Sequence, residues 1–237
     1  MTAVNSTRKP LLPPLSIHES YIASLKMWAT SPLRIHSPVL ASAFWRLSEY
    51  GITDAMLQVL DSMGHITMAI DYHIQGTPGG LTLGKIVKTR TAIQKRVMLL
   101  PPAEELNITT LSTPNTYECC RLTAIIFSVA VILPIPNTYD VLQTLVRRLK
   151  AAIEVSGTES YGAECSEVLL WILILGGIAA LDKPERSWFV SQLALLVERL
   201  KIDWAAAERI LETFLWLEIA CSSSGRRLWS EVLNLAL

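Results

Sequence analysis

The chain has few cysteines and none of the spacings that a metal or disulfide scaffold needs. Its 237 residues include four, Cys119, Cys120, Cys165 and Cys221, and no Cys-X-X-Cys pair. The common structural zinc sites contain at least one such pair, and small disulfide-rich domains are much denser in cysteine. We therefore expect free thiols in a reducing compartment, buried as small apolar side chains, with no metal and no cofactor.

The sequence also lacks net charge and a secretory signal. Lys plus Arg and Asp plus Glu each total 21, so no overall field draws the chain toward nucleic acid or anionic lipid. The start of the chain holds Arg8 and Lys9 followed by Pro10, Pro13 and Pro14, without the apolar run of a signal peptide. We expect residues 1–15 to be a disordered lead-in, and the protein to be nuclear or cytoplasmic.

The most apolar stretch is too short to span a membrane. Val168 to Leu181 is a run of 14 apolar residues that includes Gly176 and Gly177. A membrane span needs about 20 residues, and a shorter run that is apolar on all sides is typical of a buried core helix. We expect no membrane association. The two glycines are expected to allow a neighbouring helix to approach closely, or to end this helix.

Strand signals are scarce, whereas apolar residues recur at the i, i+3, i+4 spacing of helices along most of the chain. We predict an all-α fold, a single multilayer array of about ten antiparallel helices over residues 16–237. Residues 16–113 form its N-terminal part and residues 114–237 its core. The predicted helices are Ser16–Met27, Val39–Tyr50, Asp54–Ile74, Leu83–Leu100, Tyr117–Leu133, Thr138–Glu154, one starting near Glu164, Asp182–Lys201, Asp203–Cys221 and Arg226–Leu235. Asp182 and Asp203 are expected to be the N-caps of their helices, and the segment SSSG to separate the last two helices.

The sequence contains no nucleophile elbow, no His-Glu-X-X-His motif and no glycine-rich dinucleotide loop. The segment HITMAIDYH places His65 and His73 two turns apart, which predicts a shared helix face, while Asp71 lies on another face. That arrangement disfavours a three-ligand metal site. Either histidine could donate a proton in a pocket. The alternative is that both are solvent-facing or hydrogen-bonded residues of an amphipathic helix.

Two further groups of residues are candidates for binding. Glu118 and Arg121 are spaced i, i+3 and can pair, which predicts a structural ion pair. Alternatively, Arg121 faces a cavity and holds an anionic or carbonyl ligand. Trp171, Trp188 and Trp216 lie in the tryptophan-rich C-terminal half and could line an apolar ligand pocket. Core packing explains the same tryptophans.

Four motifs follow one another in the C-terminal half: YECCRLTAIIF (117–127), LLWILILGGIAA with ERSWF (169–189), FLWLEIAC (214–221) and LWSEV (228–232). In this order they resemble the regulatory, or middle homology, domain of fungal zinc-cluster transcription factors. Residues 1–116 match only loosely. The resemblance implies a helical domain that controls metabolic genes, including those of secondary metabolism. Full members carry an N-terminal zinc cluster of six cysteines that reads DNA, and this chain has no cysteine before Cys119.

Two hypotheses about function follow. In the first, the chain is a non-enzymatic transcription-regulatory domain that acts through a protein partner or as a homodimer and does not bind nucleic acid directly. In the second, a repurposed helical domain binds a hydrophobic small molecule in an apolar pocket, or converts it as a cofactor-free cyclase or pericyclase. Candidate catalytic residues for the second are His65, Tyr72, His73 and Arg121, and candidate pocket residues are Trp171, Trp188 and Trp216.

Overall fold

Helices form all the regular secondary structure that is described. The structure is a computed structural model that describes residues 15–30, 40–106, 115–134, 138–156 and 165–235. Over these ranges it contains nine α-helices and no strand, which confirms the all-α prediction. The predicted lead-in lies outside the described residues except for Leu15, where the first helix begins.

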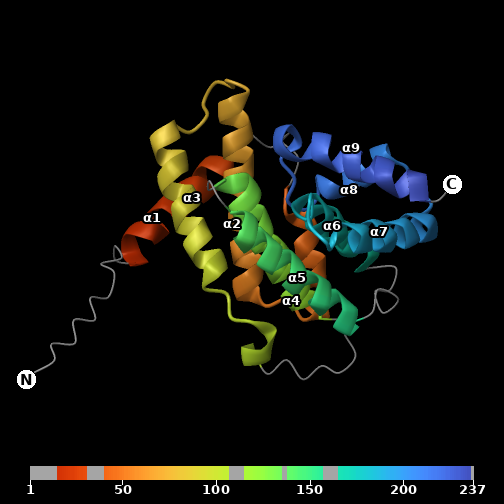
Figure 1. Cartoon of the computed structure of the whole chain (residues 1–237). Helices are drawn as coiled ribbons and strands as arrows, with labels where there is room; N and C mark the ends of the chain where they lie inside the picture. Colours follow the sequence, from red (N-terminus) through yellow and green to blue (C-terminus); the bar gives the residue numbers. More distant parts are fainter. Residues whose placement is uncertain (1–14, 31–39, 107–114, 135–137, 157–164, 236–237) are drawn as a thin grey trace, which may run out of the picture.

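The N-terminal helices pack on one another as a three-helix group. They are α1 (Leu15–Ala29), α2 (Asp54–Ile74) and α3 (Leu83–Met98), each in contact with the other two. The 3₁₀ helix η2 (Ser42–Tyr50) packs on α2, where a regular α-helix was predicted from Val39. A short 3₁₀ turn, η3 (Ala103–Leu106), follows α3. This group forms the red to yellow side of the molecule in Figure 1.

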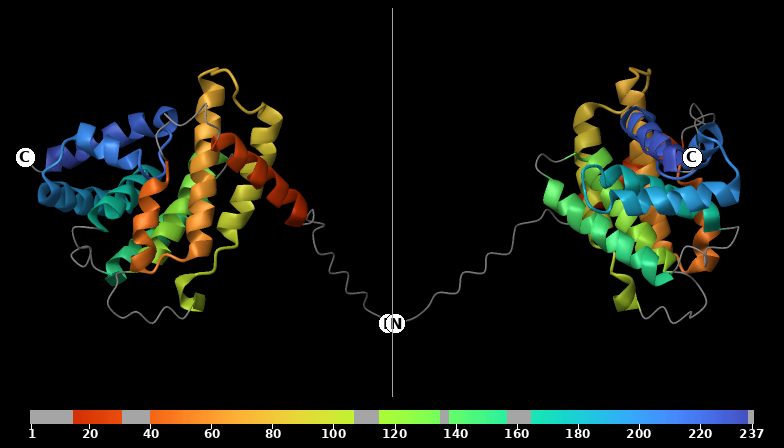
Figure 2. Two further views of the ribbon diagram at one scale, coloured as in Figure 1. Left: turned by 180° about the vertical axis from the view of Figure 1, so that it is seen from behind. Right: turned by 45° about the vertical axis from the view of Figure 1, so that its right-hand side comes forward.

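Two helices connect this group to the rest of the chain. Helix α4 (Thr116–Phe127) continues as the π-helical turn η4 (Ser128–Ile132), and α5 (Tyr139–Ser156) follows. Helix α4 contacts α3 as well as α5 and α6, and η4 contacts α2 and α3. In the left view of Figure 2, the green helices α4 and α5 are seen between the α1–α3 group and the C-terminal helices.

The C-terminal group is built around α6 (Ser166–Ala179). Helices α7 (Arg186–Leu200), α8 (Trp204–Leu211) and α9 (Glu218–Leu235) contact it, as do α4 and α5. Every residue of α6 except Glu167 and Ile178 is buried, as its apolar sequence predicts. None of the described helices combines the length and the apolar character that crossing a membrane requires.

Gly176 and Gly177 let three helices approach α6 closely. A Cβ atom on Gly176 would lie 2.5 Å from Phe189 Cε1 of α7 and 2.9 Å from Leu149 Cδ2 of α5. A Cβ atom on Gly177 would lie 2.6 Å from Leu228 Cδ2 of α9. Because α6 continues beyond both residues to Ala179, they serve close packing, the first of the two roles predicted for them.

The predicted boundary between the last two helices is wrong. The segment SSSG was expected to separate them, but α9 runs without interruption from Glu218 through Gly225 to Leu235, and the break comes earlier, after Leu211. Tertiary packing overrides the weak helix propensity of serine and glycine here. A Cβ atom at position 225 would lie 2.6 Å from Trp204 Cη2, so glycine lets α9 pack directly against that indole.

Two predicted N-caps have different outcomes. The side chain of Asp203 accepts a hydrogen bond from Ala206 N at 2.8 Å, so its capping of α8 is confirmed. Asp182 does not cap α7. It adopts the left-handed conformation with φ 58° in the turn after α6, and the helix begins four residues later at Arg186.

Candidate functional site: the outer face of α3 and the groove beside α1

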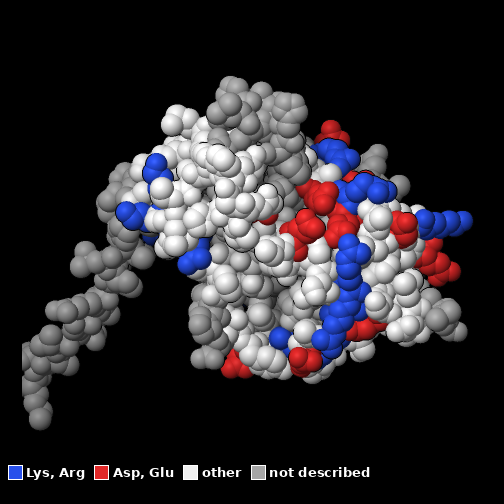
Figure 3. Space-filling view, turned by 90° about the horizontal axis from the view of Figure 1, so that it is seen from above, with Lys and Arg blue, Asp and Glu red and all other residues white. Residues whose placement is uncertain are grey.

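Helix α3 is strongly basic. Its sequence LGKIVKTRTAIQKRVM contains Lys85, Lys88, Arg90, Lys95 and Arg96 and no acidic residue. Among the described residues only Arg96 has an ion-pair partner, Glu19 of α1 at 3.4 Å. On the face drawn in Figure 3, no acidic side chain is seen beside the Lys and Arg side chains at the α1 and α3 end, whereas both signs are mixed at the opposite end. The neutral chain therefore carries a local basic surface.

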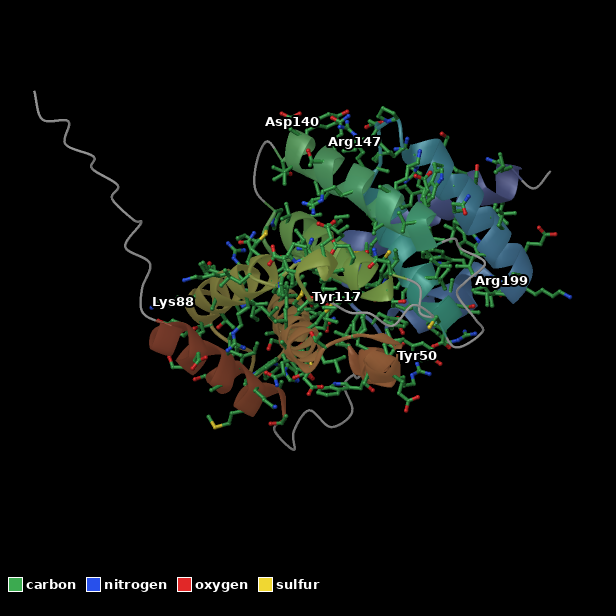
Figure 4. All side chains as sticks on the ribbon, turned by 90° about the horizontal axis from the view of Figure 1, so that it is seen from below. Tyr50, Lys88, Tyr117, Asp140, Arg147 and Arg199 are labelled. Carbon is green, nitrogen blue, oxygen red and sulfur yellow. The ribbon has the colours of Figure 1, made fainter. Side chains whose placement is uncertain are left out.

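The solvent-facing side of α3 is also partly apolar. Leu83, Val87 and Met98 are 58%, 38% and 48% exposed. At 100° per residue, Val87 and Met98 project within about 20° of each other, and Lys88 and Lys95 form a second stripe about 80° away. We call Leu83, Val87, Lys88, Lys95 and Met98 the outer face of α3. Figure 4 shows Lys88 at the edge of the molecule beside α1, far from Arg147 and Arg199 of the C-terminal half.

A half-open groove lies between α1 and α3, with a volume of about 490 Å³. Helix α1 lines it with Ser20, Tyr21, Ser24, Leu25, Met27 and Trp28, α3 with Lys85 and Thr89, and the preceding loop with Leu81. Contacts along the two helices run in opposite order, because Glu19 pairs with Arg96 and Trp28 bonds to Gly79 just before α3. The groove therefore runs between two helices of opposite chain direction.

The wall of this groove is held in place by contacts outside it. Trp28 Nε1 donates a hydrogen bond to the carbonyl oxygen of Gly79 at 2.9 Å. The indole also packs edge-on against Tyr72 of α2, with ring centroids 5.6 Å apart. Lys88 Nζ lies 5.8 Å from the centroid of the Tyr21 ring. The aromatic side chains that line the groove are thus oriented by α2, α3 and the α2–α3 loop.

The candidate catalytic residues of α2 occupy different surroundings. Helix geometry places the side chains of His65 and His73 about 80° apart around α2. His73 is exposed, whereas the side chain of His65 is 18% exposed and its Nδ1 lies 3.7 Å from Asp61 Oδ2. Burial lowers the pKa of His65, Asp61 raises it, and Lys26 of α1 lowers it further. Neither histidine lines the groove, and Tyr72 reaches it only through its contact with Trp28.

Arg121 forms the ion pair predicted from its spacing to Glu118. The contact is bidentate, with Nε donating to Oε2 at 2.8 Å and Nη2 to Oε1 at 2.6 Å, and both side chains are buried. Glu118 Oε2 also accepts a hydrogen bond from Ala103 N at 3.2 Å, which ties α4 to η3. The hydrogen bond to Glu118 raises the pKa of Arg121. This geometry indicates that the guanidinium of Arg121 stabilises the fold and does not bind a ligand.

The neighbouring Tyr117 extends the same attachment. Its hydroxyl donates to the carbonyl oxygen of Pro101 at 2.9 Å, and burial raises its pKa. Figure 4 shows Tyr117 in the interior, close to where the ribbons of α4 and the N-terminal group meet. Tyr117, Glu118 and Arg121 together fix the start of α4 to the segment after α3.

The three candidate pocket tryptophans do not line the groove. Trp171 is fully buried in α6, where Nε1 donates to Leu215 O at 3.0 Å and the ring packs edge-on against Phe44. Trp216 is also buried, beside Trp204. Trp188 is partly exposed on α7, against Phe189 and Lys150. Core packing, the alternative interpretation, therefore describes Trp171 and Trp216.

A smaller second groove of about 290 Å³ lies between η2, the start of α6 and α8. The ion pair of Arg46 with Glu167, at 3.0 Å, crosses it, and Arg209, Ile210 and Thr213 complete most of its lining. An arginine already neutralised by a carboxylate is a poor anion ligand. Over the described ranges, no three His, Cys, Asp or Glu side chains are grouped so as to hold a metal ion.

Sequence reasoning missed both features of α3. The signal for the outer face was present, because five cations and no carboxylate occur within 16 residues. The groove left no comparable signal, since Tyr21 and Trp28 are separated from Lys85 by more than 50 residues and meet it only through the packing of α1. Comparison with known proteins adds no assignment: the chain matches no protein-family profile, no curated protein and no solved structure.

Proposed function

We propose that this chain is a non-enzymatic transcription-regulatory domain that acts through a protein partner, and that the partner binds the outer face of α3. The observation that carries the proposal is one side of a helix that combines exposed apolar residues with the exposed Lys88 and the half-buried Lys95, which have no ion-pair partner among the described residues. The resemblance of the C-terminal motifs to fungal regulatory domains supplies the regulatory role. The all-α fold is compatible with that role.

The chemistry of α3 favours an acidic, amphipathic helix as the partner segment. Leu83 and Met98 are about 22 Å apart along the helix axis, and Lys88 and Lys95 lie between them. A helix with apolar residues at its two ends and carboxylates between would match both features, and helices are commonly recognised through such stripes. Opposite charges would also speed and orient the encounter.

Other occupants fit this surface less well. A second copy placed with its outer face of α3 on this one would bring Lys88 and Lys95 against the same two lysines, which electrostatics disfavours. Duplex DNA would satisfy the cations, but it would leave Leu83, Val87 and Met98 facing phosphates and water. A protein segment is therefore the occupant that we propose.

The alternative function, binding or converting a hydrophobic metabolite, has one observation in its favour, the groove between α1 and α3. The titratable residues that line the groove are Tyr21 and Lys85. The candidate catalytic residues His65, His73 and Arg121 lie outside the groove. The groove therefore favours binding over chemical conversion, and a bound ligand is compatible with a regulatory domain.

The test begins by cross-linking the full chain in its own cells, identifying the attached protein and purifying it. Binding is then measured with the wild type, with Lys88→Glu/Lys95→Glu and with the control Arg209→Glu/Arg227→Glu, whose exposed arginines lie on α8 and α9. We expect the α3 variant to weaken binding about tenfold or more and the control to stay within about twofold. Reversing carboxylates of the partner segment to lysine should restore binding to the α3 variant.

Two results would contradict the proposal. Equal weakening by both double variants would show that total charge matters and not the outer face of α3. Binding of a random-sequence DNA duplex at physiological salt that is lost in Lys88→Glu/Lys95→Glu, with no effect on the purified protein, would make nucleic acid the partner. Circular dichroism spectra and melting temperatures of each variant establish that a loss of binding is not a loss of folding.

A further inference from the structure

We propose that the groove between α1 and α3 is a binding site for an apolar organic acid: a ring system or short hydrocarbon body with one anionic head group. The body lies against Trp28 and Leu81, and the head group pairs with Lys85. This site differs from the outer face of α3 and does not depend on the partner proposed above.

The apolar part of the site is preformed. Leu25 is buried, Leu81 and Trp28 are partly buried, and the indole of Trp28 is held by its hydrogen bond to Gly79 O and its contact with Tyr72. A rigid aromatic side chain loses little conformational freedom when a ligand covers it. Such walls of aromatic and aliphatic side chains are typical of small-molecule sites.

The polar part of the site is positive and retains hydrogen-bonding capacity. Lys85 has no ion-pair partner among the described residues, and no acidic residue is among those that line the groove. The hydroxyl groups of Tyr21 and Ser24 are also in the lining. The hydroxyl proton of Thr89 is already used, because Oγ1 donates a hydrogen bond to the carbonyl oxygen of Lys85 at 2.8 Å. An ammonium group with two nearby hydroxyls suits a carboxylate or a sulfonate.

The size and openness of the groove limit the ligand. Its volume of about 490 Å³ lies within the range of small-molecule sites. Met27, which is 75% exposed, is at its edge, so the ligand enters from solvent without a movement of the core. A molecule of two or three rings, or a chain of similar volume, fills this space.

The test uses two fluorescent probes with the same ring skeleton and different charge. 8-Anilinonaphthalene-1-sulfonate carries a negatively charged sulfonate group, and N-phenyl-1-naphthylamine is the same ring skeleton without that group. We expect the full-length protein to bind the sulfonate with one-to-one stoichiometry and more tightly than the neutral probe. Lys85→Glu should weaken the sulfonate about tenfold and leave the neutral probe within about twofold. Ser24→Trp, which places an indole in the groove, should abolish the binding of both.

The matched control is Lys95→Glu, the same charge change on the same helix at a residue that does not line the groove. It should leave both probes within about twofold of the wild type. If Lys85→Glu and Lys95→Glu act alike, or if Ser24→Trp leaves the binding unchanged, the groove is not the site. If neither probe binds the folded wild type, the inference is wrong, whereas the partner assay with Lys88→Glu/Lys95→Glu is unaffected. Near-UV circular dichroism excludes probe binding to unfolded protein.

Discussion

Replacing Gly176 by alanine tests the packing around the central helix. In a helix the change from glycine to alanine favours folding by about 1 kcal/mol. Here the new methyl group meets Phe189 Cε1 at 2.5 Å and Leu149 Cδ2 at 2.9 Å, on side chains from two different helices that are both fully buried. Overfilling a packed core costs about 1–3 kcal/mol, and contacts on two sides indicate the upper end. The net loss of unfolding free energy is then about 2 kcal/mol.

Two other glycines provide matched controls for the same substitution. At Gly177 the methyl group meets one side chain, the buried Leu228, with Cδ2 at 2.6 Å, so Gly177→Ala should destabilise less than Gly176→Ala, where two side chains must move. At Gly84, in the first turn of α3, an added Cβ atom would have no neighbouring atom within 4 Å. Gly84→Ala should therefore stabilise the folded protein by up to about 1 kcal/mol.

The assay is thermal unfolding followed by circular dichroism. For a protein of this size 1 kcal/mol corresponds to about 2–4 °C, so Gly176→Ala should lower the melting temperature by about 4–8 °C. Gly84→Ala should raise it slightly. If Gly176→Ala is as stable as Gly84→Ala, α5 and α7 do not pack on α6 as described.

Three further predictions concern ionised groups. Arg121→Met removes the bidentate partner of the buried Glu118, which then keeps Arg148, 3.9 Å away, and the amide of Ala103. The unfolding free energy in urea should fall by about 3 kcal/mol, the lower end of the cost of breaking a buried ion pair, and the second change Glu118→Gln should recover part of it; a loss below about 1 kcal/mol would contradict the structural role. The hydrogen bond from Arg186 lowers the pKa of Glu231 from its ordinary value of 4.5. The pair therefore stabilises the folded state above pH 4.5, and this stabilisation is lost as the pH falls through the pKa of Glu231 in the folded protein. Glu231→Gln should therefore lower the melting temperature at pH 7. It should also make the decrease in melting temperature between pH 7 and pH 3 smaller than in the wild type, and an unchanged decrease would refute the pairing. Burial lowers the pKa of His65 below 6.5, so the unfolded chain takes up the proton first and stability falls as pH drops from 7.5 to 5; His65→Asn should flatten that slope in melting curves, and a parallel slope would show that other groups cause it.

The buried helix α6 was predictable because local sequence and packing agree there. A run from Val168 to Leu175 without a polar side chain can be covered only by other helices, and five of them contact it. The pairing of Glu118 with Arg121 was predictable for a similar reason, since residues at i, i+3 of one helix are always neighbours.

The missed features depend on contacts between distant segments. The segment SSSG predicts a break because serine and glycine disfavour helices locally, but Gly225 lies inside α9, where its lack of a side chain makes room for the indole of Trp204. The groove exists because α1 crosses α3 with Trp28 anchored to Gly79. No periodicity within one segment encodes that crossing.

The most direct test of the proposed function is deletion of the gene in its own organism, with transcripts and metabolites measured from one culture. We expect transcripts of a group of metabolic genes to fall together with their product. The wild type and Arg209→Glu/Arg227→Glu should restore them, and Lys88→Glu/Lys95→Glu should not. If the transcripts hold while one intermediate accumulates, the chain is an enzyme on a regulator-like helical fold, and the proposed function is wrong.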